Sequence, residues 1–254
     1  MPDGPLAASG LARLQRQFGL ELTQTRQLRD LVRLLAEEEH APTTVREPAR
    51  VLDEHIADAL SALALPALRN AAMIVDVGSG AGLPGLPLAI ALRDARVTLL
   101  EATGRKCAFL CALTKRLELA NVQVVHCRAE SWSAGAGLAD VVTARAVAPL
   151  DVVVEYAAPL LRLGGVLVAW RGQRDASAEA DAGRAADLLG MTAEIPIAVE
   201  PYPGSVHRHL HVFLKVAPTP PRFPRREGVA RKRPLGRLRG AQPAVHDRDA
   251  FPRS

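Results

Sequence analysis

The chain has 254 residues, 48% of them hydrophobic, and a formal net charge of +5 at pH 7. This length suits one large domain with extensions, and no apolar run reaches the roughly 20 residues that a membrane-spanning helix needs. Residues 1–4 lack the basic and apolar regions of a signal peptide, and no second Cys or His pair stands at zinc-ligand spacing beside the three cysteines. We therefore expect a cytoplasmic protein with buried, reduced thiols and no metal.

The first part of the chain, up to about residue 70, is predicted to be helical. Apolar residues recur at spacings of three and four over 6–18, 23–40 and 47–63. Thr44 is a plausible start of the third helix, with Pro48 in its first turn. We interpret residues 1–70 as a helical N-terminal extension.

A strand that turns through three glycines into a helix is the most informative feature of the chain. Residues 73–77 supply the strand, and Gly78, Gly80 and Gly82 follow it. Glycines there would let the backbone pass close to a ligand. Asp76, at the end of the strand, favours a ligand with an amino group and a sulfonium over a pyrophosphate. The alternative is a tight turn without a ligand.

Two more acids stand near predicted strand ends. Glu101 ends the strand 96–101, where a carboxylate suits the two hydroxyls of a ribose. Glu130 follows the strand 122–126, where an adenine amino group could lie. Each acid alone is also compatible with a solvated surface. Together with the glycine loop, they predict a nucleoside-binding crevice at the C-terminal edge of a parallel sheet.

Strands and helices alternate over residues 71–216. The strands are expected near 73–77, 96–101, 122–126, 139–144, 164–170 and 207–215. This alternation predicts an α/β domain with a doubly wound, mostly parallel sheet. His207, His209 and His211 stand at period two in the last strand, which could be a metal triad. A half-exposed strand explains the pattern more simply, so we expect no metal there.

Arg145 stands at the exit of the fourth strand, among small residues. An arginine there can hold a base edge or a phosphate through paired hydrogen bonds. The alternative is a structural ion pair, with Glu130 as the candidate partner. No acid–base pair is evident beside it. Methyl transfer to a ring nitrogen with a free lone pair, such as N7 of guanine, needs no deprotonation, and positioning carries most of its catalysis.

The C-terminal part of the chain is basic. Nine Lys and Arg residues stand between positions 215 and 239, against the single acid Glu227, and prolines interrupt the first half. Such a segment suits a phosphate backbone, and the alternative is a solvated tail without a partner. We expect residues 217–254 to form a basic, proline-rich and largely disordered tail.

The chain resembles the bacterial 16S ribosomal RNA (guanine-N7) methyltransferases, also called glucose-inhibited division protein B. The glycine-loop extension Gly-Leu-Pro-Gly is the most specific match. The resemblance covers roughly residues 20–235, and its motifs are 43–48 (TTVREP), 55–58 (HIAD), 76–88 (DVGSGAGLPGLPL), 99–101 (LLE), 128–130 (RAE), 145–148 (RAVA), 163–165 (LGG), 208–210 (RHL), 223–228 (FPRREG) and 232–235 (KRPL).

This resemblance implies a Rossmann-like, S-adenosylmethionine-dependent fold over 71–216. It implies methylation of guanine N7 at a guanine-527-type site of 16S ribosomal RNA. By the same resemblance Gly78 and Leu83 contact the cofactor, the backbone at Ala129 and Glu130 holds its adenine, and Arg145 lies where cofactor and substrate meet. The expected partner is the small ribosomal subunit, without DNA or membrane, and the expected state is a monomer.

Three departures and two alternatives accompany the resemblance. Glu101 replaces a common Asp, Ala41-Pro42 stands where the family usually has Asn-Leu, and Arg171 stands where a lysine usually precedes the glycine. The first alternative is an S-adenosylmethionine-dependent enzyme that methylates a small molecule. The second is a nucleotide-binding oxidoreductase, against which Asp76 argues.

Overall fold

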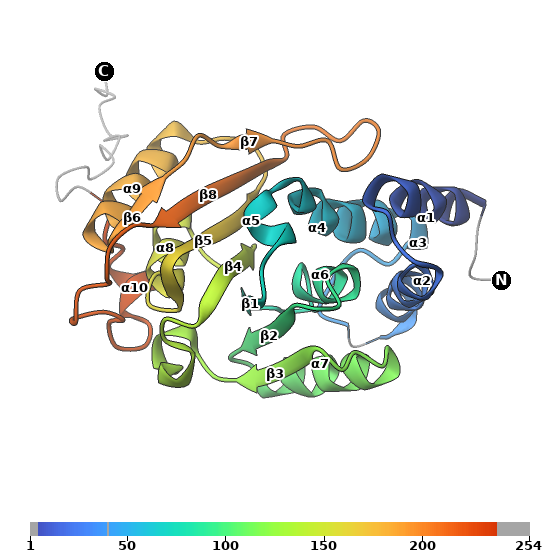
Figure 1. The fold of residues 1–254 in the computed structure, drawn as a ribbon, viewed down its shortest axis with the longest axis horizontal. Helices are drawn as coiled ribbons and strands as arrows, with labels where there is room; N and C mark the ends of the chain where they lie inside the picture. The colour runs from blue at the N-terminus through green and yellow to red at the C-terminus, as the bar shows by residue number, and fades with distance from the viewer. Residues whose placement is uncertain (1–4, 40, 238–254) are drawn as a thin grey trace, which may run out of the picture.

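A computed structural model describes residues 5–39 and 41–237 of the chain, and its N-terminal part is helical as predicted (Figure 1). The third predicted helix, 47–63, consists of successive α-helical, π-helical and 3₁₀ segments. A carboxylate cap starts it, because the Glu47 side chain accepts hydrogen bonds from the backbone N–H groups of Ala49 and Arg50 at 3.0 and 2.8 Å. The N-terminal elements are α1 (Pro5–Phe18), α2 (Leu22–Glu37), α3 (Pro48–Val51), a π-helix (Leu52–Ala57), α4 (Asp58–Leu60), a 3₁₀ turn (Ser61–Ala64) and α5 (Pro66–Arg69).

The sheet is mostly parallel and doubly wound, which confirms the predicted fold class. Its strand order is β3-β2-β1-β4-β5-β8-β6, and β7 also pairs with β8. The first five strands are parallel, whereas β8 runs antiparallel to β5, β6 and β7. The strands are β1 (Met73–Val77), β2 (Arg96–Glu101), β3 (Val122–His126), β4 (Ala139–Arg145), β5 (Leu161–Arg171), β6 (Met191–Ala193), β7 (Ile197–Ala198) and β8 (His209–Lys215).

Helices cover both faces of the sheet. They are α6 (Gly85–Ala91), α7 (Gly104–Arg116), α8 (Leu150–Ala157), α9 (Ala176–Leu188) and the short α10 (Val229–Lys232). Two 3₁₀ turns, Ala129–Ser131 and Ser133–Gly135, lie between β3 and β4. Because side chains alternate along a strand, β1 sends Ile74 to one face and Val75 to the other. Ile74 packs in a core with α6, α7 and the N-terminal helices, and Val75 in a core with α8 and α9. The predicted N-terminal extension therefore shares one core with the sheet.

The first half of the predicted disordered tail is packed against the domain. Phe223 and Ala230 are buried in the core beneath α8 and α9. Arg225 donates two hydrogen bonds to the buried Glu155 carboxylate of α8, one of them at 2.7 Å from Nε to Oε1. The expectation of disorder is thus wrong for residues 217–237, because apolar and ionic anchors hold them. Residues 238–254 lie outside the described part of the chain.

The cysteines and histidines differ from expectation in detail. Cys107 is buried, but Cys111 is exposed and Cys127 only half-buried. β8 begins two residues later than predicted, so His207 precedes it with a left-handed φ of +54°. His211 is buried rather than half-exposed. Among the described residues, no group of His, Cys, Asp and Glu could hold a metal ion, and no helix is long and apolar enough to cross a membrane.

Candidate active site

A cavity of about 340 Å³ opens at the C-terminal edge of the parallel strands. Its walls come from Gly78 after β1, Glu101 at the end of β2, Ala129 and Glu130 after β3, and Val147 after β4. Four of the predicted site residues therefore come together: Gly78, Glu101, Ala129 and Glu130. Its size falls in the range of small-molecule sites, and its place is the crevice where open α/β sheets bind ligands.

The three glycines of the loop all adopt left-handed backbone conformations, with φ of +67° at Gly78, +56° at Gly80 and +87° at Gly82. The sequence interpretation was that a Cβ would fill ligand space. In the structure, a Cβ on Gly78 would meet Val147 Cγ2 at 2.8 Å, and one on Gly82 would meet Leu86 Cδ1 at 2.3 Å. The positive φ and the neighbouring side chains therefore require glycine at both positions. Of the three glycines, only Gly78 lines the cavity.

Asp76 lies behind the loop and does not line the cavity. Its carboxylate accepts a hydrogen bond from the Thr143 hydroxyl at 2.8 Å and another from the Gly85 backbone N–H at 3.2 Å. Complete burial raises the pKa of Asp76 to about 6, against the opposing effect of these hydrogen bonds. Asp76 therefore joins β1, β4 and the start of α6. Leu83 is buried, and neither it nor Gly80 and Gly82 lines the cavity.

The Glu101 carboxylate bridges two loops. Its oxygens accept hydrogen bonds from the backbone N–H groups of Gly80 at 3.0 Å and Thr103 at 2.9 Å. The residue is only 6% exposed, yet it lines the cavity. A carboxylate has about four acceptor positions, so two remain for hydroxyl groups of a ligand. This geometry fits the ribose role expected for Glu101.

Arg145 forms an ion pair with Asp58 of α4 and not with Glu130. Its Nη1 lies 3.0 Å from Asp58 Oδ2 and 3.1 Å from the Glu54 carbonyl oxygen, and its side chain is 16% exposed. Asp58 also accepts a hydrogen bond on its backbone carbonyl from Trp170 Nε1 at 2.8 Å. Glu130 instead accepts a hydrogen bond from the Gly228 backbone N–H at 3.1 Å. Arg145 does not line the cavity.

The family model described as GidB, rRNA small subunit methyltransferase G, matches residues 24–199. A protein of this name from Chloroflexus aggregans is 44% identical over 76% of this chain and 82% of its own length. Another from Roseiflexus castenholzii is 38% identical over 89% of this chain and 98% of its own length. The chain belongs to the rRNA small subunit methyltransferase G family. The match to the family model begins within α2 and ends just after β7, so it includes most of the N-terminal helices and the parallel strands.

Solved structures agree on the fold. The S-adenosylmethionine-dependent methyltransferase SibL is 14% identical, with a TM-score of 0.56 over 83% of this chain and 74% of that one. The mitomycin 7-O-methyltransferase MmcR is 17% identical, with a TM-score of 0.54 over 84% and 69%. At such low identity these similarities establish the Rossmann-like fold and nothing more.

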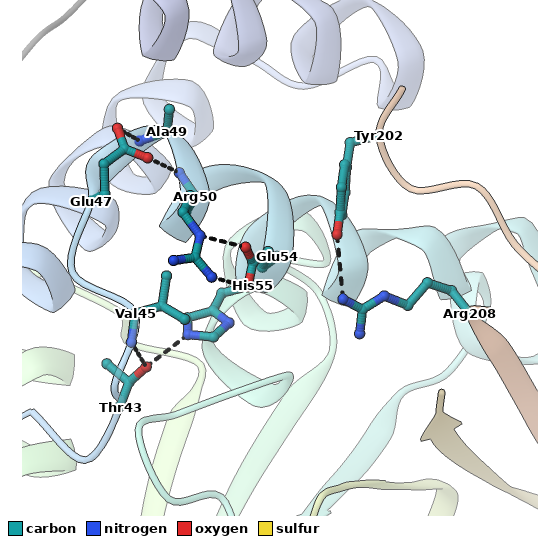
Figure 2. Close-up of polar contacts among 9 residues, drawn as sticks. All are labelled: Thr43, Val45, Glu47, Ala49, Arg50, Glu54, His55, Tyr202 and Arg208. Carbon is teal, nitrogen blue, oxygen red and sulfur yellow. Dashed lines mark hydrogen bonds and ion pairs between the residues drawn. The ribbon is translucent and has the colours of Figure 1, made fainter. Parts of the chain in front are cut away.

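Polar side chains gather around the N-terminal π-helix of this family member (Figure 2). His55 Nε2 lies 2.8 Å from the Thr43 hydroxyl, and its Nδ1 lies 3.4 Å from Arg145 Nη2. Burial lowers the pKa of His55, and the positive charge of Arg145 lowers it further. Glu54 pairs with Arg50 at 2.7 Å, and Arg208 donates to the Tyr202 hydroxyl at 3.3 Å. Sequence reasoning missed this group, although the 43–48 and 55–58 motifs contain its first members.

The tail supplies the other missed part of the site. Arg231 of α10 and Tyr156 of α8 line the cavity, and Arg231 Nη2 donates to the Val147 carbonyl at 2.8 Å. Glu227 pairs with Arg128 at 3.1 Å, which adds a second tie between the tail and the β3 side. The basic tail pattern was a signal for this segment, but it pointed to RNA and not to the cavity.

Proposed function

We propose that this chain transfers the methyl group of S-adenosylmethionine to N7 of a guanine in 16S ribosomal RNA. Family membership over residues 24–199 carries the proposal. The relatives are named as methyltransferases of small-subunit ribosomal RNA, and this chain spans 82% of the Chloroflexus relative. A nucleoside-sized cavity at the strand ends supports the same activity.

The residues of the cavity fit an adenosine group. Glu101 has acceptor positions left for ribose hydroxyls, and the backbone at Ala129 and Glu130 stands where an adenine edge would lie. At Gly78 the cavity wall consists of backbone atoms, without a side chain. S-adenosylmethionine supplies an electrophilic methyl group. Gly80 donates its backbone N–H to Glu101, Gly82 and Leu83 are buried outside the cavity, and Asp76 accepts a hydrogen bond from the Gly85 backbone.

Catalysis by this chain consists of positioning. Guanine N7 has a free lone pair, so no side chain has to remove a proton. The chain holds the base in line with the methyl group and excludes water, which can supply most of the rate. We place Arg145 at the junction of cofactor and substrate as a positioning residue. Arg145 acts through the residue that follows it at the end of β4. This residue, Ala146, has a sparsely populated φ of +55° and lines the cavity.

The proposed partner is 16S ribosomal RNA within the small ribosomal subunit, bound by a monomer in the cytoplasm. Exposed basic side chains of the tail, including Arg222, Arg226 and Lys232, are available for phosphate contacts. They lie on the same segment that forms a wall of the cavity.

The direct test is the position of the methyl group. Purified chain is incubated with isotopically labelled S-adenosylmethionine and either naked 16S ribosomal RNA or small subunits lacking the modification. Digestion and mass spectrometry should find labelled 7-methylguanosine at one position. Labelling of another atom, or no labelling of either RNA form, would contradict the proposal.

A further inference from the structure

A second cavity of about 300 Å³ lies next to the first, at the ends of β4 and β5. Pro149 and Leu150 line it, whereas Ala146 and Val147 line the cofactor cavity, so one short stretch of chain separates the two. Arg171 at the end of β5 and His211 of β8 also line the second cavity. None of these residues belongs to the proposed adenosine site.

Asp151 provides an unusual acceptor in this cavity. The residue is 3% exposed. Its Oδ1 accepts a hydrogen bond from the Val152 backbone N–H at 2.9 Å, but its Oδ2 has no hydrogen-bond partner among the described residues. The nearest cation is Nε of the exposed Arg237, at an ion-pair distance of 3.5 Å. Since a buried polar atom left unpaired is costly, this oxygen is a candidate ligand contact.

His211 and Arg171 complete a mixed set of donors and acceptors. His211 is 4% exposed, and its Nε2 lies 3.1 Å from Glu179 Oε1, so Nε2 carries the proton. Burial lowers the pKa of His211 in spite of Glu179, and its Nδ1 has no partner in the described part of the chain. Arg171 Nη2 donates to the Ala148 carbonyl at 2.6 Å, which leaves further N–H groups for a ligand.

We infer that this second cavity holds the target guanine, with Asp151 accepting hydrogen bonds from the N1–H and N2–H₂ edge of the base. This inference rests on the proposed function. A carboxylate matches that edge, and Arg171 can donate to O6. Because N1 and N2 lie across the purine ring from N7, a base held in this way keeps the N7 lone pair free. The shared wall at residues 146–149 places N7 beside the cofactor cavity.

The charge of the cavity suits the reaction. When the sulfur–methyl bond breaks and the N7–methyl bond forms, the positive charge moves from sulfur to the purine, and no proton is transferred. The methylated ring donates more strongly from N1–H, so its hydrogen bond to Asp151 strengthens towards the transition state. Glu179 and the helix-capping Asp175 add negative charge nearby. An interaction that strengthens in this way raises turnover and not only binding.

Inosine, which lacks the N2 amino group, tests the contact. Ribosomal RNA with guanosine or inosine at the mapped target position is methylated by the parent chain and by Asp151→Asn. The parent should favour guanosine clearly, and Asp151→Asn should lose about 10- to 100-fold in kcat/KM on guanosine. The variant should also discriminate less between the two bases, since Asn keeps one acceptor oxygen and cannot accept from both N1–H and N2–H₂.

Asp140→Asn is the matched control, because Asp140 lies at the opposite end of β4 and pairs with Arg162. It should keep the parent's base preference. Calorimetry with S-adenosylhomocysteine should give parental affinity for Asp151→Asn. Equal rates on inosine and guanosine by the parent would overturn the inference even if the variant failed to fold. Parental discrimination retained in a folded Asp151→Asn would also overturn it, whereas a parent inactive on guanosine would contradict the proposed function itself.

Discussion

The two halves of the crevice are built in different ways. On the β1–β2 side, the site consists of backbone held by nearby residues: a glycine loop follows its strand directly, and Glu101 bonds it at Gly80. On the β4–β5 side, the side chains are held by distant segments, as Arg145 is by Asp58, 87 residues away. A local pattern therefore specifies the first half, and tertiary packing specifies the second. Substitutions on the two sides of the crevice test this difference.

The largest expected effect comes from filling the glycine loop. Gly78→Ala places a Cβ 2.8 Å from Val147 Cγ2 in a backbone of φ +67°. We expect at least tenfold weaker binding of S-adenosylhomocysteine by calorimetry, because the loop must move to relieve the contact. Gly137→Ala is the control, since Gly137 has the same φ of +67° with open space around it. Equal cofactor affinity in the two variants would show that the clash does not matter.

Arg145→Ala should destabilise the fold as well as slow turnover. It leaves the carboxylate of Asp58, whose side chain is almost completely buried, without its cation. Removing one partner of a buried pair costs about 3–5 kcal/mol, and the partial exposure of Arg145 reduces this to roughly 2–3 kcal/mol. Thermal melting measures the loss, and Arg145→Lys should recover part of it. An unchanged Tm in Arg145→Ala would show that the ion pair with Asp58 does not contribute to stability.

Asp76 should make stability depend on pH in the acidic range. Its folded pKa of about 6 lies above the ordinary 3.8, so the folded state holds its proton longer than the unfolded state does. Stability should therefore fall as pH rises from about 4 to 6, by roughly 2–3 kcal/mol. Denaturant unfolding of the parent and of Asp76→Asn across this window measures the effect. Parallel pH profiles would contradict it.

The smallest effect separates two roles of the tail. Arg231→Ala should weaken S-adenosylhomocysteine binding several-fold, because Arg231 holds the Val147 carbonyl at the cavity wall. Arg226→Ala, an exposed residue of the same segment, should leave cofactor affinity unchanged and lower the slope of log affinity for RNA against log salt by about 1. If both variants changed the affinity for RNA and neither changed the affinity for S-adenosylhomocysteine, the tail would be an RNA contact and no part of the cofactor site.

Sequence patterns located the parts of the fold that local chemistry determines. Of the four strands that end at the cofactor cavity, β1, β2 and β3 begin and end where they were predicted, because each is a short apolar run closed by an acid or a turn, and β4 ends one residue later than predicted. The short strands β6 and β7 were missed, since two or three residues carry no periodicity. The single helix expected over 47–63 is interrupted by a π-helix, for which the sequence has no recognised signal.

The site was predicted less completely, for reasons of distance along the chain. Glu101 and Gly78 follow directly from their strands, and both line the cavity. The predicted ion-pair partner of Arg145, Glu130, was wrong, because no local pattern relates residue 145 to residue 58. The packing of the tail was also missed. Its anchors Phe223 and Arg225 reach α8, 70 residues away in the case of Arg225 and Glu155.

The bond between Trp170 and Asp58 spans 112 residues, and this affects how the chain folds while it is being made. Translation at about 5–20 residues per second separates the two residues by roughly 5–25 s. During that interval the N-terminal helices have left the ribosome, but β5, which covers part of their apolar side, has not yet been synthesised. The helices and the first strands must therefore wait as an incomplete core. Part of the apolar side of the N-terminal helices therefore stays uncovered until the fifth strand is synthesised.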